Sequence, residues 1–189
     1  MKSIYLMLIA IALFSCKENN QDQTISKTYG EIIPSTDTLY SFSSDENAPE
    51  MSCGYKNSQG DTIIPFGKYM QCFTDTFLNF AIVYDKNNTD SKMIAINRKD
   101  EIIFDVYNYD NGPDYISDGL FRIKRNGKIG YANEAGEIVI DAVYACANPF
   151  EDNKAKVALA CTLTKEGEYT RQDSDAWFYI DRKGNRIVE

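Results

Sequence analysis

Short stretches in which apolar and polar residues alternate recur along the chain, and they predict β-strands with one buried face. The alternation is clearest in Leu120–Lys124 (LFRIK) and Ala155–Leu159 (AKVAL). A period of two places every second side chain on the same side of a strand. Tyr and Phe, which favour strands, are abundant, and no amphipathic run of helical period and useful length is present. The pattern therefore predicts an all-β fold built from antiparallel β-hairpins.

Four segments of the chain share one strand–turn–strand template. In each, an apolar or aromatic strand ends in Asn or Asp, a turn residue follows three positions later, and a pair of Ile or Val residues comes soon after. Asn and Asp side chains can bond to the turn backbone, and Gly adopts the positive φ of the turn without strain. The Asn or Asp positions are Asn57, Asn97, Asn133 and Asp181, and the turn residues are Gly60, Asp100, Gly136 and Gly184.

These hairpins predict a degenerate repeat, with copies near residues 54–90, 91–126 and 127–176 and a partial copy at 177–189. A unit of two or three short strands can bury its apolar face only against a neighbour. We therefore expect degenerate repeats of antiparallel β-hairpins that form a curved or partly closed assembly of twisted sheets. A faint further copy begins at Tyr29–Pro34 (YGEIIP), which echoes Gly60–Pro65 (GDTIIP).

The repeat resembles the WG-repeat family of bacterial proteins. The resemblance rests on Lys128–Tyr131 (KIGY), with Ile129 where the family has Trp, and on Ile180–Gly184 (IDRKG), Ile64–Pro65 and Ser117–Phe121 (SDGLF). It implies a β-rich structural repeat without a fixed catalytic activity, and a fold by itself does not define a function.

The N-terminus predicts export and lipid attachment. Lys2 precedes an apolar run from Ile4 to Phe14, which is too short to span a bilayer but suits a signal sequence. Leu13–Cys16 (LFSC) resembles the lipobox of bacterial lipoproteins, which implies cleavage before Cys16 and lipidation of that residue; an ordinary secretory signal with an incidental Cys is the alternative. We expect a signal peptide at residues 1–15, a flexible tether at 16–28 and the repeat domain at 29–189. The mature protein would be an outer-membrane lipoprotein of the bacterial cell envelope, facing the periplasm or the cell surface.

Composition narrows the chemistry of the domain. The chain has 189 residues, a formal net charge of −8 and no His. The lack of His excludes Ser-His-Asp and Cys-His catalysis and His-ligated zinc. The acidic balance, without a basic cluster, argues against nucleic acid as a partner. Four Cys residues remain beside Cys16, without metal-binding spacing, and form either buried thiols or two disulfides, for which the local pairings are Cys53–Cys72 and Cys146–Cys161.

Two acidic features allow a catalytic or metal-binding interpretation. Asp110–Asp114 together with Asp118 is an acidic loop that could hold calcium, but its spacing is not that of an EF-hand, and a solvated connecting loop is favoured. Asp105 and Asp141 occupy equivalent repeat positions and could act as a glycosidase pair, although their recurrence favours a structural role in turns. We therefore assign no catalytic residue, no metal site and no cofactor.

Aromatic residues and one insertion are the remaining candidates. Tyr144, Phe150, Trp177 and Tyr179 could form a platform on which a sugar stacks, although recurrent aromatic residues are more often part of a core. The polar stretch Glu166–Asp175 accounts for the longest spacing between turns and predicts a hairpin tip. A specific contact is expected there because loops often carry function.

The combined expectation is a lipid-anchored envelope protein whose repeat domain is not an enzyme and either binds a protein or glycan or plays a structural role. A carbohydrate-active enzyme or a glycan-binding accessory protein, using carboxylates and exposed aromatic residues, is the first alternative. An immunity protein is the second, because an acidic surface suits a basic toxin.

Overall fold

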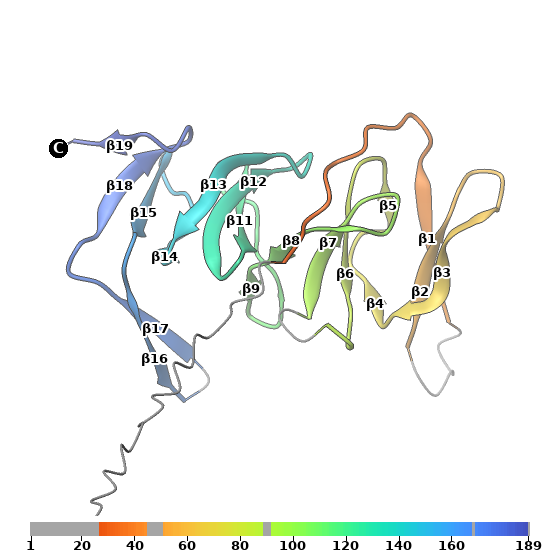
Figure 1. Ribbon diagram of the computed structural model, residues 1–189, viewed down its shortest axis with the longest axis horizontal. Coiled ribbons are helices and arrows are strands. Elements are labelled where there is room, and N and C mark those ends of the chain that lie inside the picture. Colours follow the sequence, from red (N-terminus) through yellow and green to blue (C-terminus); the bar gives the residue numbers. More distant parts are fainter. Residues whose placement is uncertain (1–26, 45–50, 89–91, 168, 189) are drawn as a thin grey trace, which may run out of the picture.

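The computed structural model describes residues 27–44, 51–88, 92–167 and 169–188, and every helix or strand assigned within these ranges is a β-strand (Figure 1). The predicted all-β fold is confirmed: the sheets are antiparallel, and none closes on itself in these ranges. No described segment forms a helix long and apolar enough to cross a bilayer. The predicted signal peptide, Cys16 and most of the tether lie outside the described residues.

The strands are β1 Leu39–Ser43, β2 Cys53–Lys56, β3 Thr62–Tyr69, β4 Gln71–Cys72, β5 Thr76–Phe77, β6 Ala81–Tyr84, β7 Met93–Ile96, β8 Ile102–Val106, β9 Asn108–Tyr109, β10 Gly112–Pro113, β11 Leu120–Arg125, β12 Lys128–Asn133, β13 Ile138–Tyr144, β14 Cys146–Ala147, β15 Lys154–Ala158, β16 Thr162–Glu166, β17 Tyr169–Asp173, β18 Phe178–Asp181 and β19 Arg186–Ile187.

The strands group into four three-stranded units that follow one another along the long axis of the molecule (Figure 1). The units are β1–β2–β3, β6–β7–β8, β11–β12–β13 and β15–β18–β19, called the first to the fourth unit below, and adjacent strands in each pair antiparallel. The second and third strands of each unit form the hairpin that the sequence template predicts. The first strand precedes that hairpin, so β1 opens the first unit.

Neighbouring units are joined through the chain that leaves each hairpin. After β3 the short strand β4 pairs with β6 of the second unit, and after β13 the short strand β14 pairs with β15 of the fourth. Between the second and third units, β8 itself pairs with β11. The result is a seven-stranded sheet, β13-β12-β11-β8-β7-β6-β4, with the four-stranded sheets β3-β2-β1-β5 and β14-β15-β18-β19 beside it.

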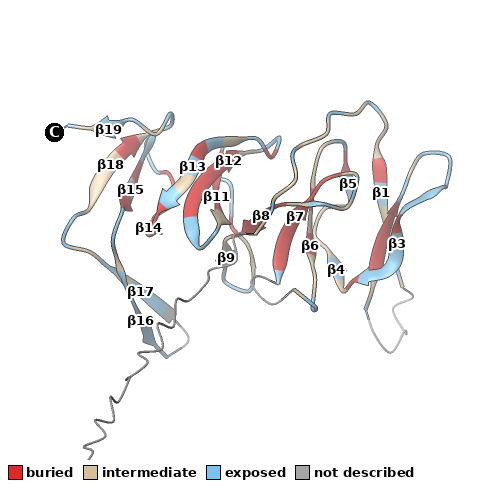
Figure 2. Ribbon diagram, viewed as in Figure 1, coloured by how far each residue is buried: buried red, intermediate tan, exposed pale blue. Residues whose placement is uncertain are grey.

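The hydrophobic core lies between successive units, and Figure 2 shows buried residues on strands of each unit. One cluster, around Tyr55, joins the first and second units; another, around Phe104 and Phe121, joins the second and third; the last, around Tyr131, joins the third and fourth. Each unit thus covers an apolar face that its neighbour could not bury alone.

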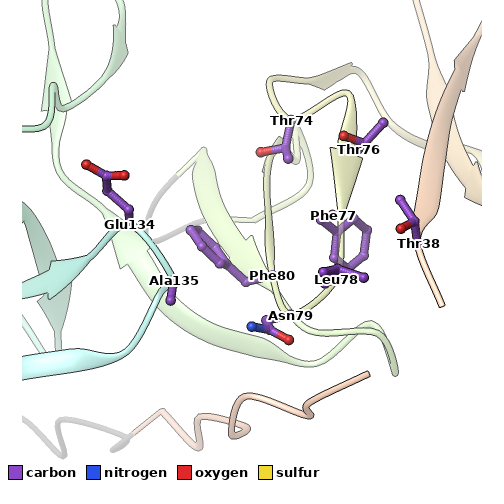
Figure 3. Close-up of a pocket in the computed structure, with 9 residues that line it drawn as sticks. All are labelled: Thr38, Thr74, Thr76, Phe77, Leu78, Asn79, Phe80, Glu134 and Ala135. Carbon is purple, nitrogen blue, oxygen red and sulfur yellow. The ribbon is translucent and has the colours of Figure 1, made fainter. Parts of the chain in front are cut away.

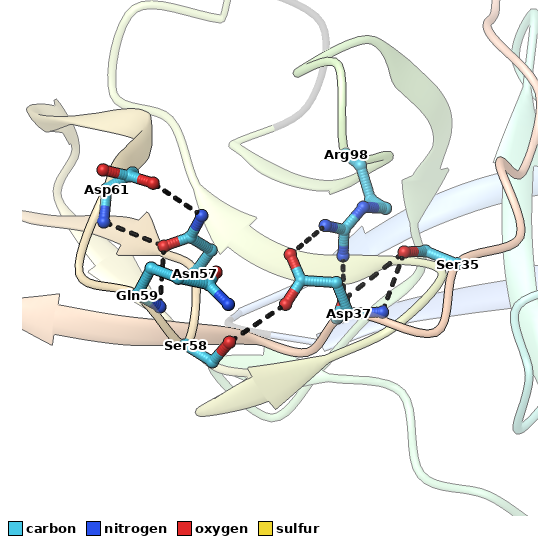
Figure 4. Close-up of polar contacts among 7 residues, drawn as sticks. All are labelled: Ser35, Asp37, Asn57, Ser58, Gln59, Asp61 and Arg98. Atoms are coloured by element: carbon cyan, nitrogen blue, oxygen red, sulfur yellow. Dashed lines mark hydrogen bonds and ion pairs between the residues drawn. The ribbon is translucent and has the colours of Figure 1, made fainter.

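The same hydrogen bonds build the hairpin turn in all four units. In the first unit, Asn57 Oδ1 accepts the backbone N–H groups two and four residues later, at 3.0 and 2.8 Å, and Asn57 Nδ2 donates to Asp61 at 3.1 Å (Figure 4). The second and third units repeat this arrangement. In the fourth unit the carboxylate and the amide change places. Asp181 stands at the Asn position and accepts the two backbone N–H groups, and Asn185, four residues later, donates its Nδ2 to Asp181 at 3.0 Å. The predicted turn chemistry is confirmed.

A bulge in the third strand explains why two units have glycine in the second strand. Gly54 and Gly130 lie three residues before the turn Asn, and β3 and β13 bulge opposite them. A Cβ on Gly130 would lie 2.5 Å from Ile140 O, closer than a side chain tolerates. The second and fourth units have Ile94 and Phe178 at this position, and Ile94 pairs with Asp105 of β8 without a register shift there.

Two disulfides form with the local pairings predicted from the sequence. Cys53–Cys72 joins β2 to β4 and thereby the first sheet to the seven-stranded sheet, and its Cα atoms are 6.1 Å apart. Cys146–Cys161 joins β14 to the base of the β16–β17 hairpin, with Cα atoms 5.9 Å apart.

Residues 27–38, called the strap below, cross the second unit before the chain enters β1 (Figure 1). At one end, Lys27 Nζ lies 2.7 Å from Asp105 Oδ1 on β8. At the other end, Asp37 accepts hydrogen bonds from Ser58 in the first turn and Arg98 in the second (Figure 4). The faint further copy predicted at residues 29–34 therefore contains no strand, and these residues belong to a segment that ties two turns together.

Candidate functional site

The two equivalent carboxylates do not meet. Asp105 is 7% exposed, and its carboxylate binds Lys27 and accepts the Tyr29 hydroxyl at 3.0 Å. Asp141 is exposed on β13, and β11 and β12 lie between β13 and β8, so three strand spacings, about 14 Å, separate the two strands. The expected turn role is wrong for both residues, because each lies within a strand. Asp105 instead holds the strap.

The acidic loop is a structural element that includes one buried carboxylate. Asp110–Asn111, with φ values of 46° and 65°, forms the two-residue turn between β9 and β10. Asp118 accepts the backbone N–H of Asn153, directly before β15, at 2.8 Å. Asp114, expected to be solvated, is buried in an ion pair with Arg122 at 2.6 Å. Across the described ranges, no group of three His, Cys, Asp or Glu residues is placed to hold a metal ion.

Arg122 is the most heavily bonded charged group in this region. Its Nε and its backbone N–H donate to Asp114 Oδ2 at 2.9 and 2.8 Å, and Nη1 donates to Ala147 O at 3.2 Å. The Tyr107 ring lies 3.9 Å from its guanidinium carbon. Burial acts to lower the pKa of Arg122, but the hydrogen bonds and charge of Asp114 outweigh it and raise the pKa overall. This cluster therefore locks the acidic loop and β14 onto the third unit.

The four aromatic candidates fall into two separate groups. Tyr144 and Phe150 are 6% and 1% exposed, so the core interpretation is confirmed for them. Trp177 and Tyr179 are only half-buried, and Tyr179 lies on the side of β18 opposite the buried Ile180. Lysine side chains of β15 lie over these two rings, at 5.4 and 5.1 Å from the ring centres. The structure thus forms no single platform from the four rings.

The predicted insertion is a separate hairpin, β16–β17 (Figure 1). Its arms span residues 162–173, so it begins four residues before the predicted stretch. The disulfide at Cys161 fixes its base, and Gln172 donates to the Tyr107 hydroxyl at 2.9 Å. All five residues of β16 are exposed.

A groove of about 530 Å³ lies between the connection that joins the first two units and the turn of the third (Figure 3). The connection contributes apolar side chains, of which Leu78 is 43% exposed, and the strap ends at one rim. The apolar residues are Phe77, Leu78, Phe80 and Ala135, and the polar residues are Thr38, Thr74, Thr76, Asn79 and Glu134.

The groove is shaped by contacts that the sequence template does not contain. Thr74 Oγ1 accepts the Ile82 N–H at 3.0 Å, which leaves its own hydroxyl hydrogen to donate. The Phe80 ring packs against Gly136, where a Cβ would clash with the ring. An apolar floor with hydroxyl, amide and carboxylate groups around it can bind a ligand that presents both apolar surface and hydrogen-bonding groups.

Sequence reasoning missed this groove because its residues come from parts of the chain that do not share the turn motif. Phe80 directly precedes β6, which begins at Ala81, and its ring lines the groove. Thr38 belongs to the strap, and Glu134 is a turn position that varies among the copies. Only the stacking of the units brings these residues together.

Comparison with known proteins supports the repeat interpretation for one part of the chain. Residues 129–159 match the family model described as "WG containing repeat". This stretch runs from β12 through β15 and so connects the third unit to the fourth. The resemblance to WG repeats is confirmed there. No curated protein and no solved structure matches the chain.

Proposed function

We propose that this chain is a lipid-anchored protein of the bacterial cell envelope whose repeat domain is a non-catalytic binding module. The apolar run, the lipobox-like Leu13–Cys16 and the polar tether support the anchor. The groove in Figure 3 supports the binding function, because it combines exposed apolar surface with hydroxyl, amide and carboxylate groups. The recurrent Asn and Asp residues of the template, in contrast, are engaged in the turns.

The tether would keep the domain close to the membrane. Lys27 is held by Asp105 in the seven-stranded sheet, so the tether joins the domain at its middle rather than at its first strand. Lys27 lies eleven positions after Cys16. A fully extended chain spans at most about 3.6 Å per residue, so the domain would stand within about 40 Å of the lipid.

Replacement of the lipidated residue tests the anchor. Cys16→Ser should move the protein from the membrane fraction to the soluble fraction, as measured by fractionation and immunoblotting. Ser15→Ala is the matched control, because it keeps a small residue before the cysteine and should leave the protein in the membrane fraction. Unchanged membrane association of Cys16→Ser would refute lipid anchoring.

A photo-crosslinking amino acid placed at Leu78 tests the groove. In intact cells it should give a discrete crosslinked species, because the side chain is exposed and lies in the groove. The same amino acid at Thr164, which is exposed on β16, is the matched control. Identical crosslinking at the two positions would contradict binding in the groove.

Glycan binding is the second candidate function, favoured by the phenyl rings and the hydroxyl, amide and carboxylate groups that line the groove. Affinity electrophoresis through envelope polysaccharides would show retardation of the wild-type protein. Leu78→Ser should abolish that retardation, whereas Leu163→Ser, which changes a residue that is 61% exposed on β16, should not. If no polysaccharide retards the wild-type protein, glycan binding is excluded.

A further inference from the structure

The strap shows how one unit binds a peptide segment along its third strand. Gly30 N–H donates to Ile102 O at 2.8 Å, and Asn97 Nδ2 donates to Glu31 O at 2.8 Å. Ile32 packs against the core cluster of the second and third units. Two hydrogen bonds to the strap backbone and one apolar contact therefore hold this part of the strap on the edge of β8 that faces away from β7, before the residues of β8 that pair with β11.

This contact requires a glycine in the bound segment. A Cβ on Gly30 would lie 2.8 Å from Glu101 Cβ and 3.2 Å from Asn97 Nδ2. Glu101 cannot easily move away, because its carboxylate accepts from Asn97 Nδ2 at 2.8 Å and its backbone N–H donates to Asn97 Oδ1 at 3.0 Å. A larger residue in place of Gly30 would push the strap off both of its hydrogen bonds.

Among the described residues, no strand pairs with the equivalent edges of the first and third units, on β3 and β13. Six residues after the turn Asn, Ile103 of the second unit is 1% exposed, and it belongs to the core cluster that Ile32 of the strap and residues of β11 share. The residues at the same position in the first and third units, Ile63 and Val139, are 40% and 41% exposed. An exposed β-branched residue on an unpaired outer strand is a site at which another chain can dock.

The side-chain amides of the turn Asn residues also differ between the second unit and the first and third units. Asn97 Nδ2 has two acceptors, the Glu101 carboxylate and the strap carbonyl. In the described part of the chain, Asn57 Nδ2 and Asn133 Nδ2 each donate only to the carboxylate four residues later. Each therefore keeps one N–H for a further acceptor, at the position where the strap carbonyl meets Asn97.

We infer that the outer edges of β3 and β13 dock peptide segments of a partner protein, and that these segments share the chemistry of the strap: glycine, any residue, then Ile or Val. The glycine would pass Asp61 or Glu137, which occupy the position of Glu101. The carbonyl of the following residue accepts from the turn Asn, and the β-branched side chain covers Ile63 or Val139. Recognition through backbone hydrogen bonds and one side-chain contact is an established mode of peptide binding to sheet edges. The inference rests on the proposed binding function and specifies the partner.

The test is a titration of the full lipidated protein, in detergent, with a fluorescent peptide of the strap sequence KTYGEIIPST, followed by anisotropy. We expect saturable binding at two sites. The peptide with Ala in place of its glycine should bind at least about tenfold more weakly, since it loses a hydrogen bond and the close approach. Ile63→Asp and Val139→Asp should each remove one site.

Two further variants separate docking from folding. Val143→Asp changes another residue of β13, 48% exposed, and should leave both sites intact. Asn133→Asp combined with Glu137→Asn reproduces the Asp–Asn pair of the fourth turn. This double variant keeps the turn but moves the amide donor from position 133 to position 137. It should therefore remove the β13 site.

The absence of saturable binding, equal binding of the Ala peptide, or equal losses for Val143→Asp and Val139→Asp would each overturn the inference. A failed peptide titration with retained crosslinking at Leu78 would overturn this inference alone and leave the proposed function in place.

Discussion

Replacing Asp114 by Ala should destabilise the domain by about 3–5 kcal/mol. The Asp114 and Arg122 side chains are 1% and 5% exposed, and the carboxylate accepts three hydrogen bonds from Arg122. The variant leaves the guanidinium buried without a counter-ion, and the loss of one partner of a buried ion pair has a cost of this size. In a domain of this length, each kcal/mol lowers Tm by about 2–4 °C, so Tm should fall by about 6–20 °C.

The assay is urea unfolding under non-reducing conditions, followed by far-UV circular dichroism. Arg171→Ala is the control for losing an ion pair at the surface: Arg171 and Asp173 are 58% and 50% exposed, and the loss should be below about 1 kcal/mol. Asp114→Leu combined with Arg122→Met removes both charges, and it should recover most of the lost stability because no buried charge remains unpaired.

Two results would refute this reasoning. Equal costs for Asp114→Ala and Arg171→Ala would mean that burial does not strengthen the pair. A double variant as unstable as Asp114→Ala would mean that the acidic loop depends on packing or on the Arg122 bond to Ala147 rather than on charge compensation.

Three other changes separate the remaining contributions. Burial raises the pKa of the core tyrosines, so the folded chain keeps protons that the unfolded chain releases; stability should fall above about pH 10, by about 1.4 kcal/mol per pH unit for each group. In unfolding curves measured between pH 9 and 11, Tyr131→Phe should make the unfolding free energy fall less steeply with pH, by the contribution of one proton. Tyr109→Phe, which changes an exposed tyrosine, is the control. Equal slopes for the two variants would contradict the raised pKa of Tyr131. Gly130→Ala should cost about 1–3 kcal/mol because its Cβ meets the β13 backbone, whereas Gly112→Ala, with 3.8 Å to its nearest neighbour, should cost little; equal unfolding midpoints would refute the clash. Cys161→Ser opens a disulfide with a sequence separation of 15, which should cost about 3 kcal/mol and speed proteolysis of the β16–β17 hairpin; wild-type cleavage rates would show that the hairpin does not need this link.

The sequence was sufficient where structure is determined by neighbouring residues. The turn at Asn133 and Gly136 follows from side-chain bonds that span four residues and from a φ of 81° at the glycine. The sequence left buried thiols and disulfides open, but the pairings that form are the local ones, each joining residues fewer than twenty positions apart. In both cases the chemistry of a short segment limits the possible conformations to very few.

The sequence was insufficient where a residue acts through a distant one. Asp114 has the composition of a solvated loop around it, but it is buried in an ion pair with Arg122, whose guanidinium also donates to Ala147 O, 25 residues further along the chain. Asp105 recurs in the template with Asp141, yet only Asp105 meets the strap, 78 residues away at Lys27. These contacts depend on which unit or segment covers a given face, and the repeat pattern alone does not encode this.

Tyr131 and Tyr179 show this most directly, because they occupy the same position of the template, two residues before the turn Asn or Asp. Tyr131 is fully buried, its hydroxyl donates to Asn148 O at 2.7 Å, and its ring meets Phe150 at 4.8 Å. Tyr179 is half-buried beneath a lysine side chain. The difference comes from the fourth unit, which covers the core around Tyr131, whereas no described unit covers Tyr179. Residue type in this repeat therefore does not determine burial; the neighbouring segment does. Binding surfaces should accordingly be sought at template positions that are covered in one unit and bare in another.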